Sequence, residues 1–426
     1  MVEDQQVRRP CPAVSLTSAA AAIVIAGVTV ITQAGDARPG GVRVAAADPA
    51  APTGTPRATS STDPDLTSAV KTRMDHATAS SYGVVVDIEG RGRVVSLNGG
   101  RSLLPASTEK LFTTLPLLLN HSTDRLMTVI GATAAPRAGV VHGDLVVRTS
   151  GDPTLMAGGL ATLARHVHAA GVRRVTGRLV LGTGTLPWTR TRDGWKSSYV
   201  PWDVGPLSPF PVHYDTWKTT NWYVGHPTAG NVALLRGKLT KAGVHIVGGN
   251  AAARNPAMPT VLARYSSAVM ADIVRHTLRQ SDNFAAEQML SMQGWTPIND
   301  VVTAAHSGGT ATDGSGLSLR DRRTAAGEVA LLEYAHSSSA ASLLVRALPV
   351  ACRSGTLKDE FCNTVAAGAV FAKTGTINHV KALAGYTTDA NGRWVTFAFI
   401  TNGDTSTSRA MTAIVRSVLL LRHYAK

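Results

Sequence analysis

Three short groups of residues carry side chains that together suit nucleophilic acyl transfer. In chain order they are Ser107-Thr108-Glu109-Lys110, Ser281-Asp282-Asn283 and Lys373-Thr374-Gly375. Each group alone arises readily by chance. All three in this order form a strong joint signal for a serine nucleophile with a lysine base.

Ser107 is the predicted nucleophile and Lys110 its predicted base. Ser107 opens a helical run, so its N–H lies at the positive end of a helix, and Lys110, one turn later, shares its face. A serine hydroxyl is a poor nucleophile until a base removes its proton. Lysine does this only when neutral, and burial together with a second cation at Lys373 would lower its pKa. Taken alone, the motif also fits an ordinary helix-start serine with a solvated lysine.

Ser281 and Asn283 lie at a polar interruption between two helical stretches, where both side chains can face a cleft. Ser281 can relay a proton between Lys110 and a leaving amine. Asn283 can donate to a substrate carbonyl and accept from Lys110. A helix cap is the alternative for this tripeptide alone.

Lys373 and the residues after it follow the β-rich run VAAGAVFA, which predicts an edge strand beside the nucleophile. Gly375 lets a substrate backbone approach closely, and the N–H of Thr376 can join that of Ser107 in an oxyanion hole. Lys373 and the hydroxyls of Thr374 and Thr376 can bind a terminal carboxylate. A strand with one exposed lysine is the alternative.

Hydrophobic periodicity indicates the elements that would position these residues. A helical stretch at 66–76 precedes the β-rich runs SYGVVVDIEG and RVVSLNGG, which predict a hairpin. VKALAGYTTD and RWVTFAFITN predict a second hairpin, followed by a helix over 408–424. We expect strands from both ends to share one sheet, and helix over 264–295 apart from the polar break.

Composition divides the chain into an export segment, a linker and an interrupted folded domain. Residues 1–35 contain an uncharged stretch after Arg8 and Arg9, which predicts a signal peptide or a membrane anchor. The Pro- and Ala-rich stretch 36–64 predicts a disordered linker. The remaining predictions are a first part of the folded domain, an inserted β-rich domain and a second part, at 65–125, 126–261 and 262–426.

Charge and cysteine content restrict the partners. The net charge is +14, yet the Lys and Arg residues are scattered, which favours a generally basic surface and argues against nucleic acid as a partner. The spacing of His and Cys matches no metal motif, so we expect no metal and no cofactor. Cys352 and Cys362 form a disulfide if the protein is exported, or two unpaired thiols.

Longer segments resemble one family. They are PASTEKLFTT, TSGDPTLMAGG, RQSDNFAAEQML, DGSGLS, CRSGTLKDEF and FAKTGTINHVKALAGY. Together they resemble the D-alanyl-D-alanine carboxypeptidase/endopeptidase family of class C low-molecular-mass penicillin-binding proteins, the S13 peptidases. The resemblance covers about 65–426. SGDPTL falls in the predicted insertion, where β-lactamases have no counterpart.

The resemblance implies an α/β (α+β) serine β-lactamase/transpeptidase-like fold, with an antiparallel sheet, helices and the β-rich insertion. It implies an exported serine-type D-Ala-D-Ala carboxypeptidase that acts on peptidoglycan stem peptides through an acyl-enzyme on Ser107. The family's base, second motif and third motif match Lys110, Ser281 with Asn283, and Lys373-Thr374-Gly375. β-Lactam antibiotics would be covalent inhibitors. The stretch between Ser107 and Ser281 looks shorter than is usual in the family, which puts endopeptidase action in doubt.

Other functions remain open on the sequence. A β-lactamase shares the three motifs but needs a deacylating Glu, and none with a following Asn occurs at a suitable position. A general esterase on the same scaffold and a non-catalytic wall-binding protein are the further alternatives. The aromatic stretch 197–226 fits either a wall-binding surface at the cleft or the core of the insertion. If the insertion folds as a separate unit, replacing 126–261 by a short Gly-Ser linker should leave acylation by a β-lactam measurable but weaken hydrolysis of wall-derived peptides.

Overall fold

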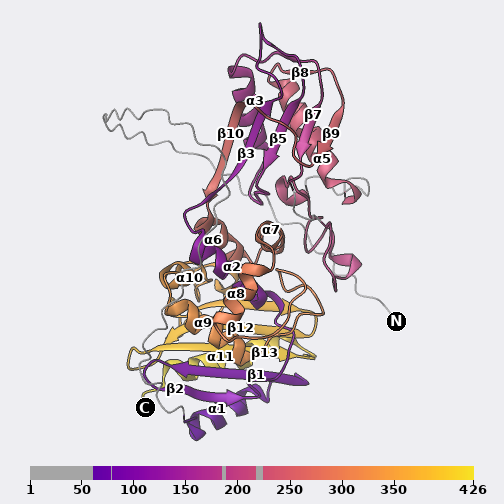
Figure 1. Cartoon of the computed structure of the whole chain (residues 1–426). Coiled ribbons are helices and arrows are strands. Elements are labelled where there is room, and N and C mark those ends of the chain that lie inside the picture. Colours follow the sequence, from indigo (N-terminus) through magenta and orange to yellow (C-terminus); the bar gives the residue numbers. More distant parts are fainter. Residues whose placement is uncertain (1–60, 78, 185–188, 217–223) are drawn as a thin grey trace, which may run out of the picture. The chain divides into compact units, whose positions relative to one another are not determined.

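The described part of the chain starts just before its first helix. The structure, a computed structural model, describes residues 61–77, 79–184, 189–216 and 224–426 (Figure 1). The predicted export segment and most of the predicted linker lie outside these residues. Helix α1 (Pro64–Met74) begins inside the predicted linker, because the Asp63 side chain accepts from the N–H of Leu66 and Pro64 suits a first helical position. No helix within the described ranges has the length and apolar character needed to span a bilayer.

Strands from both ends of the chain form one antiparallel sheet, the first sheet. Its order is β11-β12-β13-β1-β2. The strands are β1 (Ser81–Ile88), β2 (Gly92–Leu97), β11 (Phe371–Ile377), β12 (Val380–Thr388) and β13 (Trp394–Asn402). Both predicted hairpins and the shared sheet are confirmed. β11 is an edge strand, as predicted for the segment with Lys373.

Alternating side chains give the first sheet two apolar faces. Val85 pairs with Ala398, and both join the core that contains helix α2 (Glu109–Asn120). Val84 pairs with Phe399, and both join the opposite core with α1 and α11 (Thr407–Arg422). The period of two along each strand therefore lets helices cover both faces.

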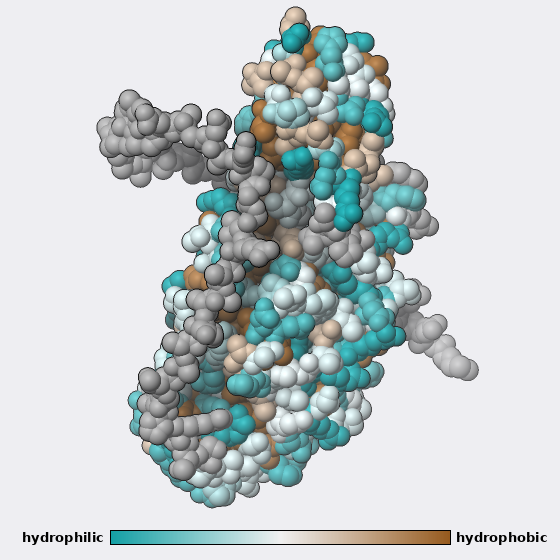
Figure 2. Space-filling model, in the orientation of Figure 1, coloured by the Kyte–Doolittle hydropathy of each residue, from teal (hydrophilic) through white to brown (hydrophobic). Residues whose placement is uncertain are grey.

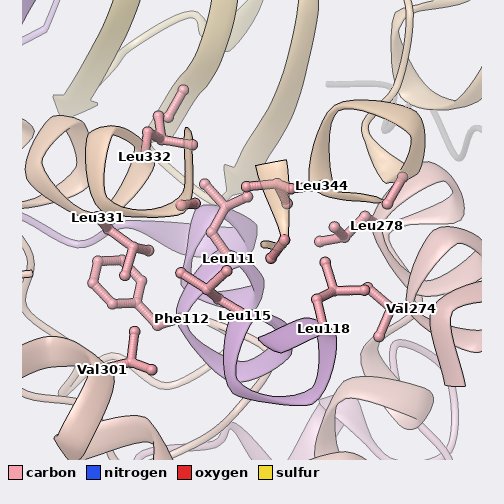
Figure 3. Packing of buried hydrophobic residues seen from close by; sticks show 14 of the residues in the cluster. Leu111, Phe112, Leu115, Leu118, Val274, Leu278, Val301, Leu331, Leu332 and Leu344 are labelled. Atoms are coloured by element: carbon pink, nitrogen blue, oxygen red, sulfur yellow. The ribbon is translucent and has the colours of Figure 1, made fainter. Parts of the chain in front are cut away.

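Helix α2 lies at the centre of the first core. Figure 3 shows its apolar side chains directed toward the surrounding helices. Those helices are α6 (Met270–Gln280), α8 (Thr296–Ala304), α9 (Ala325–His336) and α10 (Ala341–Ala347). Leu111, Leu115 and Leu118 recur at helical spacing and are at most 1% exposed. Truncation of one such leucine to alanine costs about 2–5 kcal/mol, so this packing holds the helix firmly.

The segment between α2 and α6 builds a second sheet with its own core. Its order is β10-β3-β5-β7-β9, with parallel pairs β5–β7 and β7–β9. The strands are β3 (Arg125–Ala132), β5 (Leu145–Thr149), β7 (Leu179–Gly182), β9 (Asn250–Ala253) and β10 (Thr260–Val269). Helices α3 (Ala157–Ala169) and α5 (Pro227–Lys241) contribute apolar residues to this core. Short parallel strands β4 (Val140–Val141), β6 (Arg174–Val175) and β8 (His245–Ile246) form a third sheet.

Strand β10 runs past the predicted boundary at 261. Residues from Arg264 to Ser266 pair with β3, and Val269 pairs with Arg125. The prediction of helix from residue 264 is therefore wrong at its start: α6 begins at Met270. Cross-strand pairing decides the conformation of this stretch, and pairing partners over a hundred residues away leave no local pattern.

The segment 189–216 lies between the second sheet and α7 (Asn283–Gln293). It includes short turns of 3-10 helix, η2 (Ser197–Tyr199) and η3 (His213–Asp215). Tyr199 and Leu207 pack with Phe284 of α7, whereas Phe210 joins the core of the second sheet. The aromatic stretch thus contributes to two cores.

Large apolar side chains also occur on the described surface. Trp202 is 78% exposed, and Val247 and Val365 are also exposed. Figure 2 shows one face on which apolar groups are interspersed with hydrophilic residues. Singly exposed apolar residues are usual on soluble proteins and indicate no particular partner.

Candidate active site

Ser107 lies at a tight junction between the first sheet and α2. It is the middle residue of η1 (Ala106–Thr108), which leads directly into α2. Ala106 has φ 49°, a left-handed conformation that is uncommon for residues other than glycine. A Cβ at Gly375 would come within 2.6 Å of the Pro105 carbonyl oxygen. Gly375 is therefore needed for the approach of β11 to the chain before Ser107, a contact within the protein itself.

Lys110 makes three hydrogen-bond contacts through one nitrogen. Its Nζ lies 2.8 Å from Ser107 Oγ, 2.7 Å from Asn283 Oδ1 and 2.6 Å from the Ser315 carbonyl oxygen. An amide oxygen and a carbonyl oxygen can only accept hydrogen bonds, so a neutral amine would donate its two hydrogens to them. Its lone pair then faces the remaining partner, the hydroxyl of Ser107.

Burial prepares Lys110 for the neutral state. The side chain is fully buried, and this desolvation lowers the pKa of Lys110 to about 8. The carboxylates of Asp313 and Glu287 oppose this lowering. The sequence predicts that the charge of Lys373 lowers the pKa of Lys110, but the effect is seen at Lys373 instead. Burial, followed by the charge of Lys110, lowers the pKa of Lys373 well below its usual value.

Ser281 and Asn283 occupy the break between α6 and α7, as predicted. Ser281 ends α6 in a left-handed conformation with φ 56°, and the Asp282 side chain caps α7 by accepting from the N–H of Ala285. Asn283 donates through Nδ2 to the Asp203 carbonyl oxygen at 2.8 Å. This contact with the 189–216 segment orients the amide so that Oδ1 faces Lys110.

The third motif lies on β11, next to the second. Lys373 is fully buried, and its Nζ donates to Ser281 Oγ at 2.9 Å and to the Thr374 carbonyl oxygen at 2.8 Å. The Thr374 hydroxyl donates to Thr356 Oγ1 at 2.7 Å. Thr376 is exposed on the same strand. The structure brings all eight predicted site residues together.

A cleft of about 230 Å³ opens at this junction. Its lining residues come from all three motifs, the loop before β11, strand β12 and helix α11, and are Ser107, Ser281, Thr356, Glu360, Thr374, Thr376, Lys381 and Met411. A disulfide joins Cys352 to Cys362, which confirms that prediction and closes the loop that carries Thr356 and Glu360. The reacting groups therefore face a concave site of a size that suits part of a peptide.

Comparison with known proteins agrees with this geometry. A model of the D-Ala-D-Ala carboxypeptidase 3 (S13) family matches residues 66–205 and 210–424. The chain belongs to the S13 family. It is 30% identical to carboxypeptidase DacB of Mycolicibacterium smegmatis, with 83% of this chain and 86% of that protein covered. It is 29% identical to a D-alanyl-D-alanine carboxypeptidase of an Actinomadura species, with 76% and 78% covered.

Penicillin-binding protein 4 of Haemophilus influenzae has the same fold. The TM-score is 0.75 at 20% identity, and the match covers 83% of this chain and 99% of that one. The predicted transpeptidase-like fold and the predicted S13 serine-type D-Ala-D-Ala carboxypeptidase are confirmed. Within the described ranges, no group of three or more His, Cys, Asp or Glu side chains is placed to hold a metal ion.

The S13 site includes a support behind Lys110 that the sequence reasoning missed. Glu287 Oε1 accepts from the N–H groups of Gly314 and Ser315 at 3.0 and 2.8 Å, and Oε2 accepts from Arg192 Nε at 2.9 Å. The Ser315 carbonyl then accepts from Lys110. The segment DGSGLS contributes to the family resemblance, but its residue types give no signal for this role of its backbone.

Asp313 shapes the turn that presents the Ser315 carbonyl. Its carboxylate accepts from the N–H groups of Gly316 and Ser318 at 2.7 Å each, and from Trp195 Nε1 at 2.7 Å. Trp195 belongs to the 189–216 segment. Together with Arg192 and Asp203, it places three contacts from this segment on the groups around Lys110.

The remaining residues of the first motif are buried polar anchors. Glu109 forms a two-pronged ion pair with Arg323 at 2.8 and 2.7 Å, and both side chains are at most 3% exposed. Thr108 Oγ1 lies within hydrogen-bond distance of both the Pro105 carbonyl oxygen and the Glu328 carboxyl group. These bonds fix the start of α2, and hence the position of Ser107, relative to the loop at 323 and helix α9.

Proposed function

We propose that Ser107 attacks the carbonyl carbon between the two terminal D-alanines of a peptidoglycan stem peptide. Its hydroxyl proton passes to Lys110 Nζ as the Oγ–C bond forms. Collapse of the tetrahedral intermediate breaks the C–N bond, releases D-alanine and leaves an ester on Ser107. Water then hydrolyses the ester and regenerates the hydroxyl. The contact set of Lys110, with two acceptors and one hydroxyl, is the observation that carries this proposal.

Ser281 is the proposed proton donor to the leaving amine. Its hydroxyl lines the cleft with Ser107 and accepts a hydrogen bond from Lys373 Nζ. A hydroxyl that accepts from one neighbour can donate to another, so Ser281 can give its proton to the amine and regain the proton that Lys110 took from Ser107. Because Lys373 is enclosed, we assign it to holding the Ser281 hydroxyl in this relay, whereas the sequence predicts direct contact of Lys373 with a carboxylate.

Thr374, Thr376 and two backbone N–H groups are the proposed substrate-binding groups. The N–H groups of Ser107 and Thr376 would donate to the oxyanion of the tetrahedral intermediate. The hydroxyls of Thr374 and Thr376 line the cleft, and both would bind the terminal carboxylate once the O–H of Thr374 turns from Thr356 toward it. Asn283 would hold Lys110 and donate to the peptide.

The protein is proposed to act outside the cytoplasm and to be acylated by β-lactams. Support comes from its uncharged stretch at 10–35 and from relatives. Penicillin-binding protein 4 of Haemophilus influenzae is described in complex with a β-lactam, and the predatory endopeptidase Bd3459 of Bdellovibrio bacteriovorus with penicillin G as an acyl group. The stretch at 10–35 would be a cleaved signal or a retained anchor. The proposed domain organisation is a catalytic unit interrupted by the segment that carries the second sheet.

Labelled penicillin tests the nucleophile directly. The wild-type protein should become covalently labelled and release D-alanine from a pentapeptide, whereas Ser107→Ala should do neither. Ser68→Ala, an exposed serine on α1, is the matched control and should behave as wild type. Labelling of a folded Ser107→Ala protein would refute the assignment. Products from a cross-linked muropeptide would report endopeptidase action.

A further inference from the structure

The two lysines of the sequence motifs are poorly placed to meet a substrate carboxylate. Lys110 and Lys373 are both fully buried, and their Nζ atoms are occupied by partners inside the protein. Lys373 lies beside the charge of Lys110, and burial already disfavours its own charge. A peptide ending in D-alanine nevertheless brings a full negative charge into the cleft. Another cation should therefore meet it.

Lys381 lines the cleft and is directed at the third motif. It lies on β12, where the strand register pairs it with Thr376 of β11. Its Nζ donates to Thr376 Oγ1 at 2.9 Å. The threonine oxygen thus acts as acceptor toward Lys381, which leaves its own O–H free to donate. An ammonium and a free hydroxyl hydrogen side by side are suitable ligands for one carboxylate.

The surroundings of Lys381 favour its charged form more than those of Lys373. Burial lowers the pKa of Lys381, but the carboxylates of Glu360 and Asp404 oppose this lowering. For Lys373, the neighbouring charges of Lys110 and Lys381 both add to the lowering. Glu360 lines the same cleft, so it can serve as the counter-charge of Lys381 until substrate arrives.

We infer that Lys381 binds the α-carboxylate of the terminal D-alanine, together with the Thr376 hydroxyl, and so makes the enzyme specific for peptides with a free C-terminal acid. This inference rests on the proposed acyl-enzyme reaction at Ser107. Lys381 takes no part in bond making or proton transfer. Its effect should appear only with substrates that carry the carboxylate.

The test compares two peptides that differ only at this group: one ending in D-Ala-D-Ala and one ending in D-Ala-D-alaninamide. Lys381→Met should lower kcat/KM for the acid by roughly 10- to 100-fold, the worth of a charge-assisted hydrogen bond. The amide should change by less than about 3-fold, within the spread of a neutral hydrogen bond. Lys381→Arg keeps the charge and donors and should retain most of the preference for the acid.

Lys358→Met is the matched control, because it removes one positive charge from an exposed side chain on the neighbouring loop. It should leave the acid-to-amide ratio unchanged. A Lys381→Met protein with the wild-type acid-to-amide ratio would overturn the inference. If both rates fall by the same factor, Lys381 only supports Thr376. If the wild-type protein cleaves neither peptide, the proposed reaction at Ser107 itself is wrong. That result can be told apart from a failure of the inference about Lys381, in which the wild-type protein is active.

Discussion

Arg192 offers the sharpest test of whether the 189–216 segment belongs to the catalytic centre. It pairs with Glu287, and the two side chains are 14% and 0% exposed. Arg192→Met keeps much of the aliphatic volume and leaves Glu287 without its cation. Removing one partner of a buried ion pair costs about 3–5 kcal/mol while the other stays charged. The loss should also loosen the Ser315 turn and slow acylation by about 10- to 100-fold, because the base is then less well placed.

The destabilisation should depend on pH in a defined direction. Burial raises the pKa of Glu287 to about 7 even with Arg192 present, so in the wild type ionisation lowers stability as pH rises from the ordinary value of 4.5 toward 7. Without Arg192 the pKa of Glu287 in the folded protein is higher still, so stability continues to fall as the pH rises above 7. The variant should therefore lose about 1–2 kcal/mol near pH 6, where hydrogen bonds alone are removed. Near pH 8.5 it should lose about 3–5 kcal/mol.

Urea unfolding at the two pH values measures this difference. Arg178→Met removes the partner of Asp144 in an ion pair that is 59% and 24% exposed, and it should cost about 0–1 kcal/mol at either pH. A double-mutant cycle that combines Arg192→Met with Glu287→Gln measures the coupling energy between Arg192 and Glu287. The reasoning is refuted if Arg192→Met resembles the control, or if its destabilisation shrinks as pH rises.

Three further predictions concern the base, the disulfide and the insertion. If neutral Lys110 is the base, as proposed, acylation by a labelled β-lactam should rise with pH and level off above about 8, and Lys110→Arg should be slower by about 100-fold or more. A rate that falls with pH, or a fully active arginine variant, would assign the base to another residue. Replacing Cys352 and Cys362 by alanine should cost about 3 kcal/mol and lower peptide hydrolysis, because Thr356 and Glu360 in the closed loop line the cleft; unchanged unfolding and turnover would contradict this. Replacing 126–261 by a Gly-Ser linker should abolish acylation, since it removes Arg192 and Asp203; a folded deletion protein that still labels would show that the remaining contacts suffice.

The features that could be predicted from the sequence have local causes. Alternating apolar residues in SYGVVVDIEG and RWVTFAFITN predict strands, and pairing of these strands follows from the need to bury both faces. The left-handed Ser281 and the cap at Asp282 agree with a polar break between helices. The order of the three motifs predicts a shared site. The start of α6 was misplaced because β10 pairs with a strand far away in sequence.

The features that could not be predicted depend on long-range contacts between groups that look ordinary in sequence. Ser315 acts through its backbone carbonyl, which any residue type could supply, so its side chain carries no signal. Glu287 and Arg192 resemble solvated surface charges until folding buries them together. Lys381 is one of many scattered lysines, and only the register of β12 against β11 places it beside Thr376.

The 189–216 segment of the insertion contacts the groups that surround Lys110. A separate domain that only leaves and returns at nearby points would make no contact with the groups around Lys110. Here the 189–216 segment supplies the Asp203 carbonyl that orients Asn283, the Trp195 donor to Asp313 and the cation for Glu287. Asn283 contacts Lys110 Nζ directly, whereas Asp313 and Glu287 act through Ser315, whose carbonyl oxygen contacts the same nitrogen. Because a general base must be held closely to its geometry, changes in this segment should alter the acylation step as well as substrate recognition.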